Sequence, residues 1–252
     1  MNKRNAYSKK SAAGYSLLEL VLVLAIIATL LGFLLPKGFD ALRNARVQQV
    51  GKTIDTLKTA LADFITLPGG NGSIPRTEGT GVPTSGAALT GATDIAKGNG
   101  ARLDTVLLAT GKLDRPLSLR MGSQVYTSTG TGNEMQWSQS SFAFIMTPDA
   151  APQRNWSLVT RVEARTSAPA TLPSIALGAN FRLDGVNDLK ANLVVAYLVI
   201  VGVPAKDAYD LAVQLNGPQL APVEGAACDT GQIAYAAPIN GITDVYIYLT
   251  SV

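Results

Sequence analysis

The sequence of 252 residues contains no histidine and only one cysteine, Cys228. The absence of histidine excludes Ser-His-Asp and Cys-His catalysis and most zinc sites. A single cysteine excludes an intrachain disulfide and any CxxC metal or redox motif, and it gives no indication of the redox compartment. Hydrophobic residues make up 47% of the chain, which is enough to bury a core in one large domain or two small ones.

Acidic residues are absent from the first 14 positions, where basic residues gather. The whole chain has 21 Lys and Arg against 18 Asp and Glu, a formal net charge of +3. Without Lys3, Arg4, Lys9 and Lys10 the balance is 17 against 18, so the basic character belongs to the N-terminal tail. A basic nucleic-acid-binding domain is therefore not indicated.

A long apolar run follows the basic tail and contains one carboxylate. Residues 14–36 read GYSLLELVLVLAIIATLLGFLLP, with Glu19 near the start. The uninterrupted part, Leu20 to Leu35, has 16 residues, or about 24 Å of helix, somewhat less than the roughly 20 residues that span a bilayer comfortably. An ionised carboxylate alone at the centre of a bilayer costs roughly 3 kcal/mol or more, so Glu19 requires a compensating group.

Two simpler interpretations of this N-terminus are a cleaved signal peptide and an uncleaved membrane anchor. In a signal peptide the small-residue cleavage site follows the apolar region, whereas here Ala12, Ala13 and Gly14 precede it. Lipoprotein processing needs a cysteine directly after the apolar run, and none is present. An anchor oriented by cytoplasmic Lys and Arg explains the leucines but gives no reason for Glu19.

The order of these parts resembles the N-terminus of the type IV pilins and of the pseudopilins of type II secretion. Precursors in this family carry a short basic leader that ends in glycine, followed by an aromatic or apolar residue. Glutamate stands at the fifth mature position, and an apolar helix with a later proline follows. Gly14, Tyr15, Glu19 and Pro36 occupy these places here, and the resemblance covers only the N-terminal part of the chain.

The resemblance implies cleavage after Gly14 by a prepilin peptidase and methylation of the new amine of Tyr15. It also implies that Glu19 pairs with the Tyr15 amine of a neighbouring subunit in a helical filament, which offsets the desolvation of both charges and sets the register. The alternative is that the Glu19 carboxylate snorkels toward the lipid headgroups. At Gly32 and Pro36 we expect a helix break, although Pro36 would also mark the end of a membrane segment.

The rest of the chain predicts an α+β fold in which a long helix packs on an antiparallel sheet. Residues 37–67 predict an amphipathic helix that continues the membrane helix, with a face made of Phe39, Leu42, Val47, Val50, Ile54, Leu57, Leu61 and Phe64. Residues 68–133 are rich in Gly, Thr and Ser and predict a variable surface region with a small helix near Leu103; a linker between two domains is the alternative. After the leader 1–14 and the apolar helix 15–36, residues 37–252 would form one head, for which the resemblance implies the pilin fold.

Strands are predicted from Glu134 onward. The shorter ones are Ser141–Met146, Trp156–Val162, Phe181–Leu183, Ile233–Ala237 and Val245–Thr250. The nearly continuous apolar run from Asn192 to Val203 predicts a central strand, or two, and is too short for a second membrane helix. Pro204 then opens a helix with the face Ala208, Leu211, Ala212 and Leu215.

Two short motifs are candidates for chemistry, and we interpret both as turns. Asp229-Thr230-Gly231 matches the catalytic tripeptide of aspartic proteases, but a carboxylate dyad needs two copies and the sequence has one. Asp184, Asn187 and Asp188 would offer oxygen ligands to a calcium ion, as some pseudopilins do near their C-terminal strands. Short polar residues in this arrangement more often form a hairpin turn.

A second resemblance, to the type IVb pilins, covers the apolar strand that reaches Val203-Pro204 and the helix after it. In that group the helix usually carries a cysteine bonded to another near the C-terminus. Here Ala208 or Tyr209 stands at that place, so Cys228 has no partner and the subclass stays open.

These observations predict a non-enzymatic structural subunit of a type IV pilus-like filament, with no cofactor. The expected partners are a prepilin peptidase, identical or homologous subunits, an inner-membrane assembly platform and, before assembly, the lipid bilayer of the bacterial inner membrane. The head would lie outside the cytoplasm and finally in an extracellular or periplasmic filament. The alternatives are a type II secretion pseudopilin and, more distantly, a membrane-anchored extracytoplasmic binding protein or a hydrolase that uses its carboxylates.

The first prediction concerns processing at the Gly14–Tyr15 junction. The mature chain should begin at Tyr15 with a methylated amine, as read by mass spectrometry of the purified protein. A Gly14→Val change places a side chain next to the cleaved bond and should leave the full-length precursor in the membrane. A mature N-terminus at Met1 in the unchanged protein, or one after Pro36, would contradict the prediction.

Overall fold

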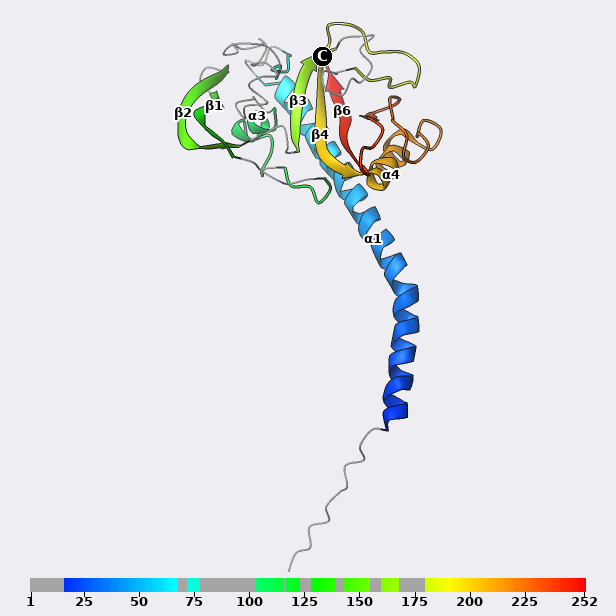
Figure 1. The fold of residues 1–252 in the computed structure, drawn as a ribbon. Coiled ribbons are helices and arrows are strands. Elements are labelled where there is room, and N and C mark those ends of the chain that lie inside the picture. Colours follow the sequence, from blue (N-terminus) through cyan, green and yellow to red (C-terminus); the bar gives the residue numbers. More distant parts are fainter. Residues whose placement is uncertain are drawn as a thin grey trace, which may run out of the picture. The chain divides into compact units, whose positions relative to one another are not determined.

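The computed structural model describes residues 16–67, 72–77, 103–115, 117–122, 128–138, 143–154, 160–167 and 180–252. The chain divides into two compact units, Met1–Asn44 and Ala45–Val252. The helices are α1 (Leu17–Ile65), α3 (Leu103–Ala109) and α4 (Ala205–Asn216). The strands are β1 (Ser128–Ser138), β2 (Ala143–Arg154), β3 (Arg161–Thr166), β4 (Val194–Pro204), β5 (Ile233–Tyr235) and β6 (Ile242–Ser251), as Figure 1 shows. The chain therefore has the predicted α+β class.

The second half of α1 buries one face. Its buried residues recur at three- and four-residue spacing, which places them in one stripe on the helix: Val47, Val50, Ile54, Leu57, Ala60, Leu61 and Phe64. The prediction was wrong for Phe39 and Leu42, which are 62% and 59% exposed. Both belong to the first unit, none of whose described residues is buried, so they have no core to join.

The central sheet has four antiparallel strands in the order β3-β4-β6-β5. Strand β4 lies between β3 and β6, which confirms the prediction of a central strand, and Figure 1 shows the three side by side. Alternate residues of β4 join two different clusters of buried side chains, one on each face. Because both faces are covered, β4 reads as a nearly continuous apolar run.

The larger cluster joins α1 to one face of the sheet. It contains the buried stripe of α1 together with Ala196, Leu198 and Ile200 of β4 and Val245 and Ile247 of β6. The smaller cluster covers the other face with Val195, Tyr197, Val199, Val201, Ala234 and Phe181. The predicted arrangement of a helix on an antiparallel sheet is thus present.

Helix α4 forms as the sequence predicts. Pro204 stands directly before it, where a fixed φ suits a helix start and no amide is lost, and Gly217 follows its end with φ 79°. Ala208, Leu211 and Ala212 are buried, as expected of the predicted face. Closing strands were also predicted correctly as β5 and β6.

Other strand predictions need correction. The strand predicted at Trp156–Val162 begins at a later residue: β3 starts at Arg161. Residues 155–159 lie outside the described part of the chain. Ser141 also lies outside it, and β2 begins at Ala143 and pairs only with β1, in a separate two-stranded sheet.

No strand forms at Phe181–Leu183. The Leu189 amide donates to the Phe181 carbonyl, so this short segment closes into a loop on itself instead of pairing with a neighbouring strand.

Two described parts of the predicted surface region 68–133 are tied to the central sheet, whereas residues 128–133 belong to strand β1 of the two-stranded sheet. Helix α3 starts at Leu103, as predicted, and Asp104 accepts a hydrogen bond from the Val162 amide at 3.1 Å. Thr77 exchanges backbone and side-chain hydrogen bonds with Ala164 of β3 at 2.6 to 3.0 Å. These bonds extend the edge of the sheet at β3 and reduce its exposed backbone.

A buried ion cluster lies on the sheet face opposite α1. Glu163 of β3 bonds Arg161 at 2.5 Å and Arg165 at 3.1 Å, and the Tyr197 hydroxyl donates to it at 2.7 Å. Burial alone would raise the pKa of the Glu163 carboxyl, but the two arginines and the hydrogen bonds hold it below its ordinary value. Burial raises the pKa of Tyr197 far above its ordinary value, so this hydroxyl keeps its proton and acts as a donor.

The fold predicts that a soluble fragment of residues 37–252 retains the head structure. The buried residues of α1 all lie at or after Val47, and both clusters lie within the second unit, so the fragment keeps every contact of its core. Gel filtration should show a non-aggregated species with a cooperative thermal transition by circular dichroism. Aggregation of this fragment, next to monodisperse full-length protein in detergent, would show that the head does not fold alone.

The ion cluster predicts a strong effect of Glu163→Gln. The change leaves two buried guanidinium groups without their carboxylate and should lower the free energy of unfolding at pH 7 by about 3–5 kcal/mol. Glu224→Gln, which alters an exposed carboxylate 4.0 Å from Lys206, should change it by less than about 1 kcal/mol in the same urea titration.

The depressed pKa also predicts a pH dependence. The stability that Glu163 contributes is present above the ordinary value of 4.5 and is lost as the pH falls through the lower folded-state value. Glu163→Gln should therefore show a smaller loss of stability in acid than the unchanged protein. Equal acid sensitivity of the two would contradict the assignment.

Candidate membrane and assembly helix

The first half of α1 is apolar on every side. All described residues from Ser16 to Leu42 are exposed, and the exposed fraction of the large apolar ones ranges from 82% at Leu17 to 46% at Ile27. In the described part of the chain, α1 is the helix long and apolar enough to cross a membrane, with a mean hydropathy of 2.8 over its most apolar window. A surface of this kind is stable only against lipid or against other apolar helices, so it is compatible with membrane anchoring.

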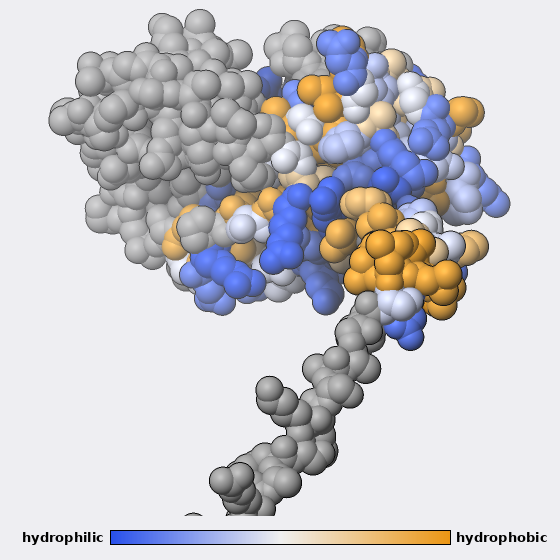
Figure 2. Space-filling model, turned by 60° about the horizontal axis from the view of Figure 1, so that its bottom comes forward, coloured by the Kyte–Doolittle hydropathy of each residue, from blue (hydrophilic) through white to orange (hydrophobic). Residues whose placement is uncertain are grey.

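The second unit has a different surface. Among the residues of this unit that the structure describes, the exposed large apolar ones are fewer: Leu183, Val186, Val223, Ile239, Ile242 and Val252. Figure 2 shows hydrophilic residues over much of the described part of one face, next to hydrophobic ones. The first unit is therefore the part of the chain that requires an apolar environment.

Glu19 lies in the first turn of α1 and bonds its own helix start. The Ser16 amide donates to Glu19 Oε2 at 3.0 Å, and the Glu19 amide donates to Ser16 Oγ at 3.3 Å. This reciprocal pair is a capping box, which satisfies two amides that a helix start otherwise leaves without partners. The pattern Ser16-x-x-Glu19 in the sequence is typical of a capping box, although only a partner in another subunit was expected for Glu19.

Gly14 and Tyr15 lie outside the described residues. Glu19 is therefore placed with respect to Ser16 only, and its expected pairing with a Tyr15 amine stays a prediction.

The helix is not interrupted at Gly32 or Pro36, contrary to the predicted break in the single chain. Proline lacks an amide proton, so Pro36 removes the helical partner of the carbonyl of Gly32, four residues before it. The rest of α1 keeps its hydrogen bonds on either side, and an added Cβ at Gly32 would have no neighbour within 4 Å. The loss of one hydrogen bond in a helix of 49 residues thus weakens this turn without ending the helix.

The candidate calcium residues lie in a turn, as the sequence predicts. Asp184 accepts hydrogen bonds from the amides of Val186 and Asn187 and from the Asn187 side chain, at 2.7 to 2.9 Å. These bonds, led by that of the Asn187 side chain, lower the pKa of Asp184 to about 2. Asp188 pairs with Arg182 at 2.9 Å, and no group of three His, Cys, Asp or Glu in the described residues is placed to hold a metal.

The Asp229-Thr230-Gly231 motif is also a turn. Gly231 has φ 83°, and a Cβ there would lie 2.3 Å from the side chain of Asn216, so only glycine fits. Asp229 lies 3.4 Å from Arg182. The motif connects Cys228 to β5, and Cys228 itself is buried and free, with its pKa raised by burial.

A comparison with known proteins finds no matching family model, no matching curated protein and no matching solved structure. The functional interpretation therefore depends on the residues and geometry of this chain.

Proposed function

We propose that this chain is a structural subunit of a type IV pilus-like filament, matured by a prepilin peptidase that cleaves after Gly14 and methylates Tyr15. The observation that carries the proposal is the fully exposed apolar half of α1, with Glu19 at its start and a glycine five residues before that glutamate. A helix in lipid alone needs the apolar surface but not this carboxylate.

The exposed surface supports two successive environments for the same helix. Before assembly, lipid covers the residues from Leu17 to Leu35. In a filament, the equivalent helices of neighbouring subunits would cover them. The head, with its own two clusters of buried side chains, would then stay folded in both environments.

The position of Glu19 supports a role in adding subunits. In the single chain its carboxylate caps the first turn of α1 through the Ser16 amide. Cleavage after Gly14 creates a cationic amine on Tyr15, directly before Ser16. A Tyr15 amine on a neighbouring subunit would then offer Glu19 a charged partner that is stronger than a neutral amide.

The capping box favours a second candidate, a membrane-anchored protein with an extracytoplasmic head. In that case Glu19 would serve only its own helix, and the anchor would remain monomeric. A type II secretion pseudopilin is the alternative within the proposed family and would share the processing and the role of Glu19.

A comparison of three variants separates these functions. Glu19→Leu removes the carboxylate, and Glu19→Gln keeps its shape without the charge. Ser16→Ala is the matched control, because it removes the other half of the capping box and leaves the carboxylate in place. Each variant should reach normal membrane levels and be cleaved at Gly14, as judged by immunoblot.

The proposal predicts few or no filaments by electron microscopy from Glu19→Leu and Glu19→Gln cells. Loss of one partner of a buried ion pair costs roughly 3–5 kcal/mol, whereas loss of a helix cap costs about 1 kcal/mol. Ser16→Ala cells should therefore form filaments in near-normal numbers. Wild-type numbers of filaments from Glu19→Leu cells, or no filaments from the unchanged protein, would refute the assembly role.

A further inference from the structure

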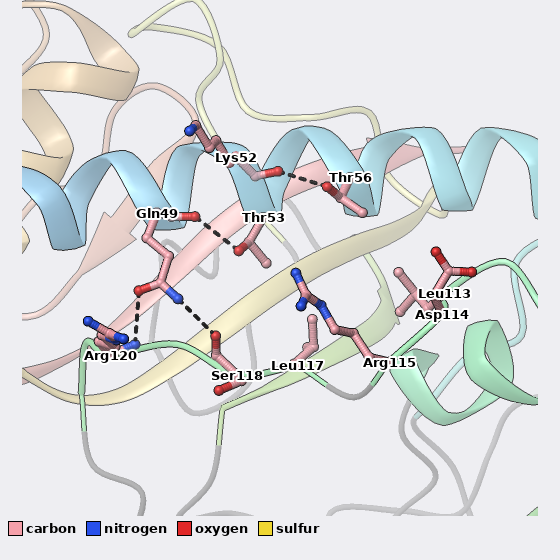
Figure 3. Close-up of a pocket in the computed structure, with 10 residues that line it drawn as sticks. All are labelled: Gln49, Lys52, Thr53, Thr56, Leu113, Asp114, Arg115, Leu117, Ser118 and Arg120. Atoms are coloured by element: carbon pink, nitrogen blue, oxygen red, sulfur yellow. Dashed lines mark hydrogen bonds between the residues drawn. The ribbon is translucent and has the colours of Figure 1, made fainter.

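A pocket lies within the second unit, between α1 and the segment 113–120 that follows α3. Its volume is 490 Å³, which falls in the range of small-molecule sites. On the side of α1 it is lined by Gln49, Lys52, Thr53 and Thr56, and on the other side by residues that include Asp114, Arg115, Ser118 and Arg120 (Figure 3).

Three of the neutral side chains of this pocket already make hydrogen bonds within the protein. Thr53 and Thr56 donate their hydroxyls to carbonyls of α1, both at 3.0 Å. Gln49 donates to the Ser118 carbonyl at 3.1 Å and accepts from the Arg120 amide at 3.4 Å. The side-chain donors that remain for a ligand are therefore the Ser118 hydroxyl and the charged groups of Arg115 and Arg120.

Arg115 and Arg120 differ from the other arginines whose side chains the structure describes. Neither Arg115 nor Arg120 has a carboxylate within ion-pair distance among the described residues, although Asp114 also lines the pocket. The other arginines with described side chains all make ion pairs or side-chain hydrogen bonds: Arg43, Arg46, Arg76, Arg161, Arg165 and Arg182. Both side chains are exposed, and the lack of an acidic partner leaves both guanidinium groups available to an anion from outside the described chain.

The two guanidinium groups lie at separate places in the pocket. Figure 3 shows that the side chain of Arg115 points toward Thr53 and that of Arg120 lies beside Gln49, with Lys52 above them on α1. Each guanidinium can bind one carboxylate or phosphate group in a bidentate manner. We propose that this pocket binds a small organic or inorganic anion with at least two such acidic groups, one for each arginine.

The experiment uses the full-length protein in a non-ionic detergent and isothermal titration calorimetry at low salt. Pyrophosphate and citrate are the two probes, because they present paired phosphate and paired carboxylate groups respectively. At least one of them should bind with a dissociation constant below about 1 mM, and the preferred probe identifies the acidic group. Binding of neither probe would overturn the proposal.

Variants then locate the binding. Arg115→Gln and Arg120→Gln should each weaken the preferred probe about tenfold or more, since each removes one charge-assisted bidentate contact. Lys190→Gln is the matched control, because it removes an exposed cation that does not line the pocket, and it should leave binding unchanged. Circular dichroism confirms the fold of each variant. Unchanged binding in both arginine variants, or an equal loss in Lys190→Gln, would show that the anion binds elsewhere.

Discussion

The packing of one stripe of α1 on the sheet is the interaction on which the rest of the head depends. From Val47 to Phe64 the helix supplies buried residues to the larger cluster, which also contains β3, β4, β5 and β6. Apart from Ala60, six fully or nearly buried side chains at roughly 1.5–3 kcal/mol each provide more driving force than any single polar contact of the head. The same helix has no such stripe before Val47, and that change of pattern within one continuous helix separates the part that needs lipid or neighbours from the part that folds with its own sheet.

The coarse fold was predictable because it follows from two periodicities. Spacing of three and four residues identified the amphipathic part of α1, and the apolar run from Asn192 identified β4 and its burial on both faces. The ion cluster was missed because charged residues in a strand usually face solvent. Arg161, Glu163 and Arg165 do alternate with the apolar Val162 and Ala164, so the period of two was visible, but the burial of the charged face depends on distant segments. The strand prediction for Phe181–Leu183 was wrong for a related reason, since strand propensity alone does not supply a neighbouring strand to pair with.

Prediction of the candidate sites met a similar limit. The capping box of Ser16 and Glu19 is local and follows from a four-residue sequence pattern. It was not predicted, because only a distant partner was expected for Glu19. The turns at Asp184 and at Asp229 were predicted correctly, because short polar residues next to glycine form such turns locally. The pocket lies between α1 and a segment about seventy residues later in the sequence, as the Gln49 bonds to Ser118 and Arg120 show. No local sequence motif could therefore predict it.

The Glu19 carboxylate has two alternative partners that differ in strength: an amide of its own helix and, in the proposed filament, the amine of a neighbouring subunit. As a cap it satisfies an amide of its own helix, an interaction that contributes about 1 kcal/mol and needs no second molecule. A neighbour's cationic amine would hold the same carboxylate more strongly, and its loss from a buried core would cost several times as much. If the proposed filament forms, the cap would keep the carboxylate hydrogen-bonded while a subunit is alone, and the exchange of a weaker neutral partner for a stronger charged one would then favour assembly. A single residue would in this way serve both the isolated helix and the proposed filament without a change in the fold of the head.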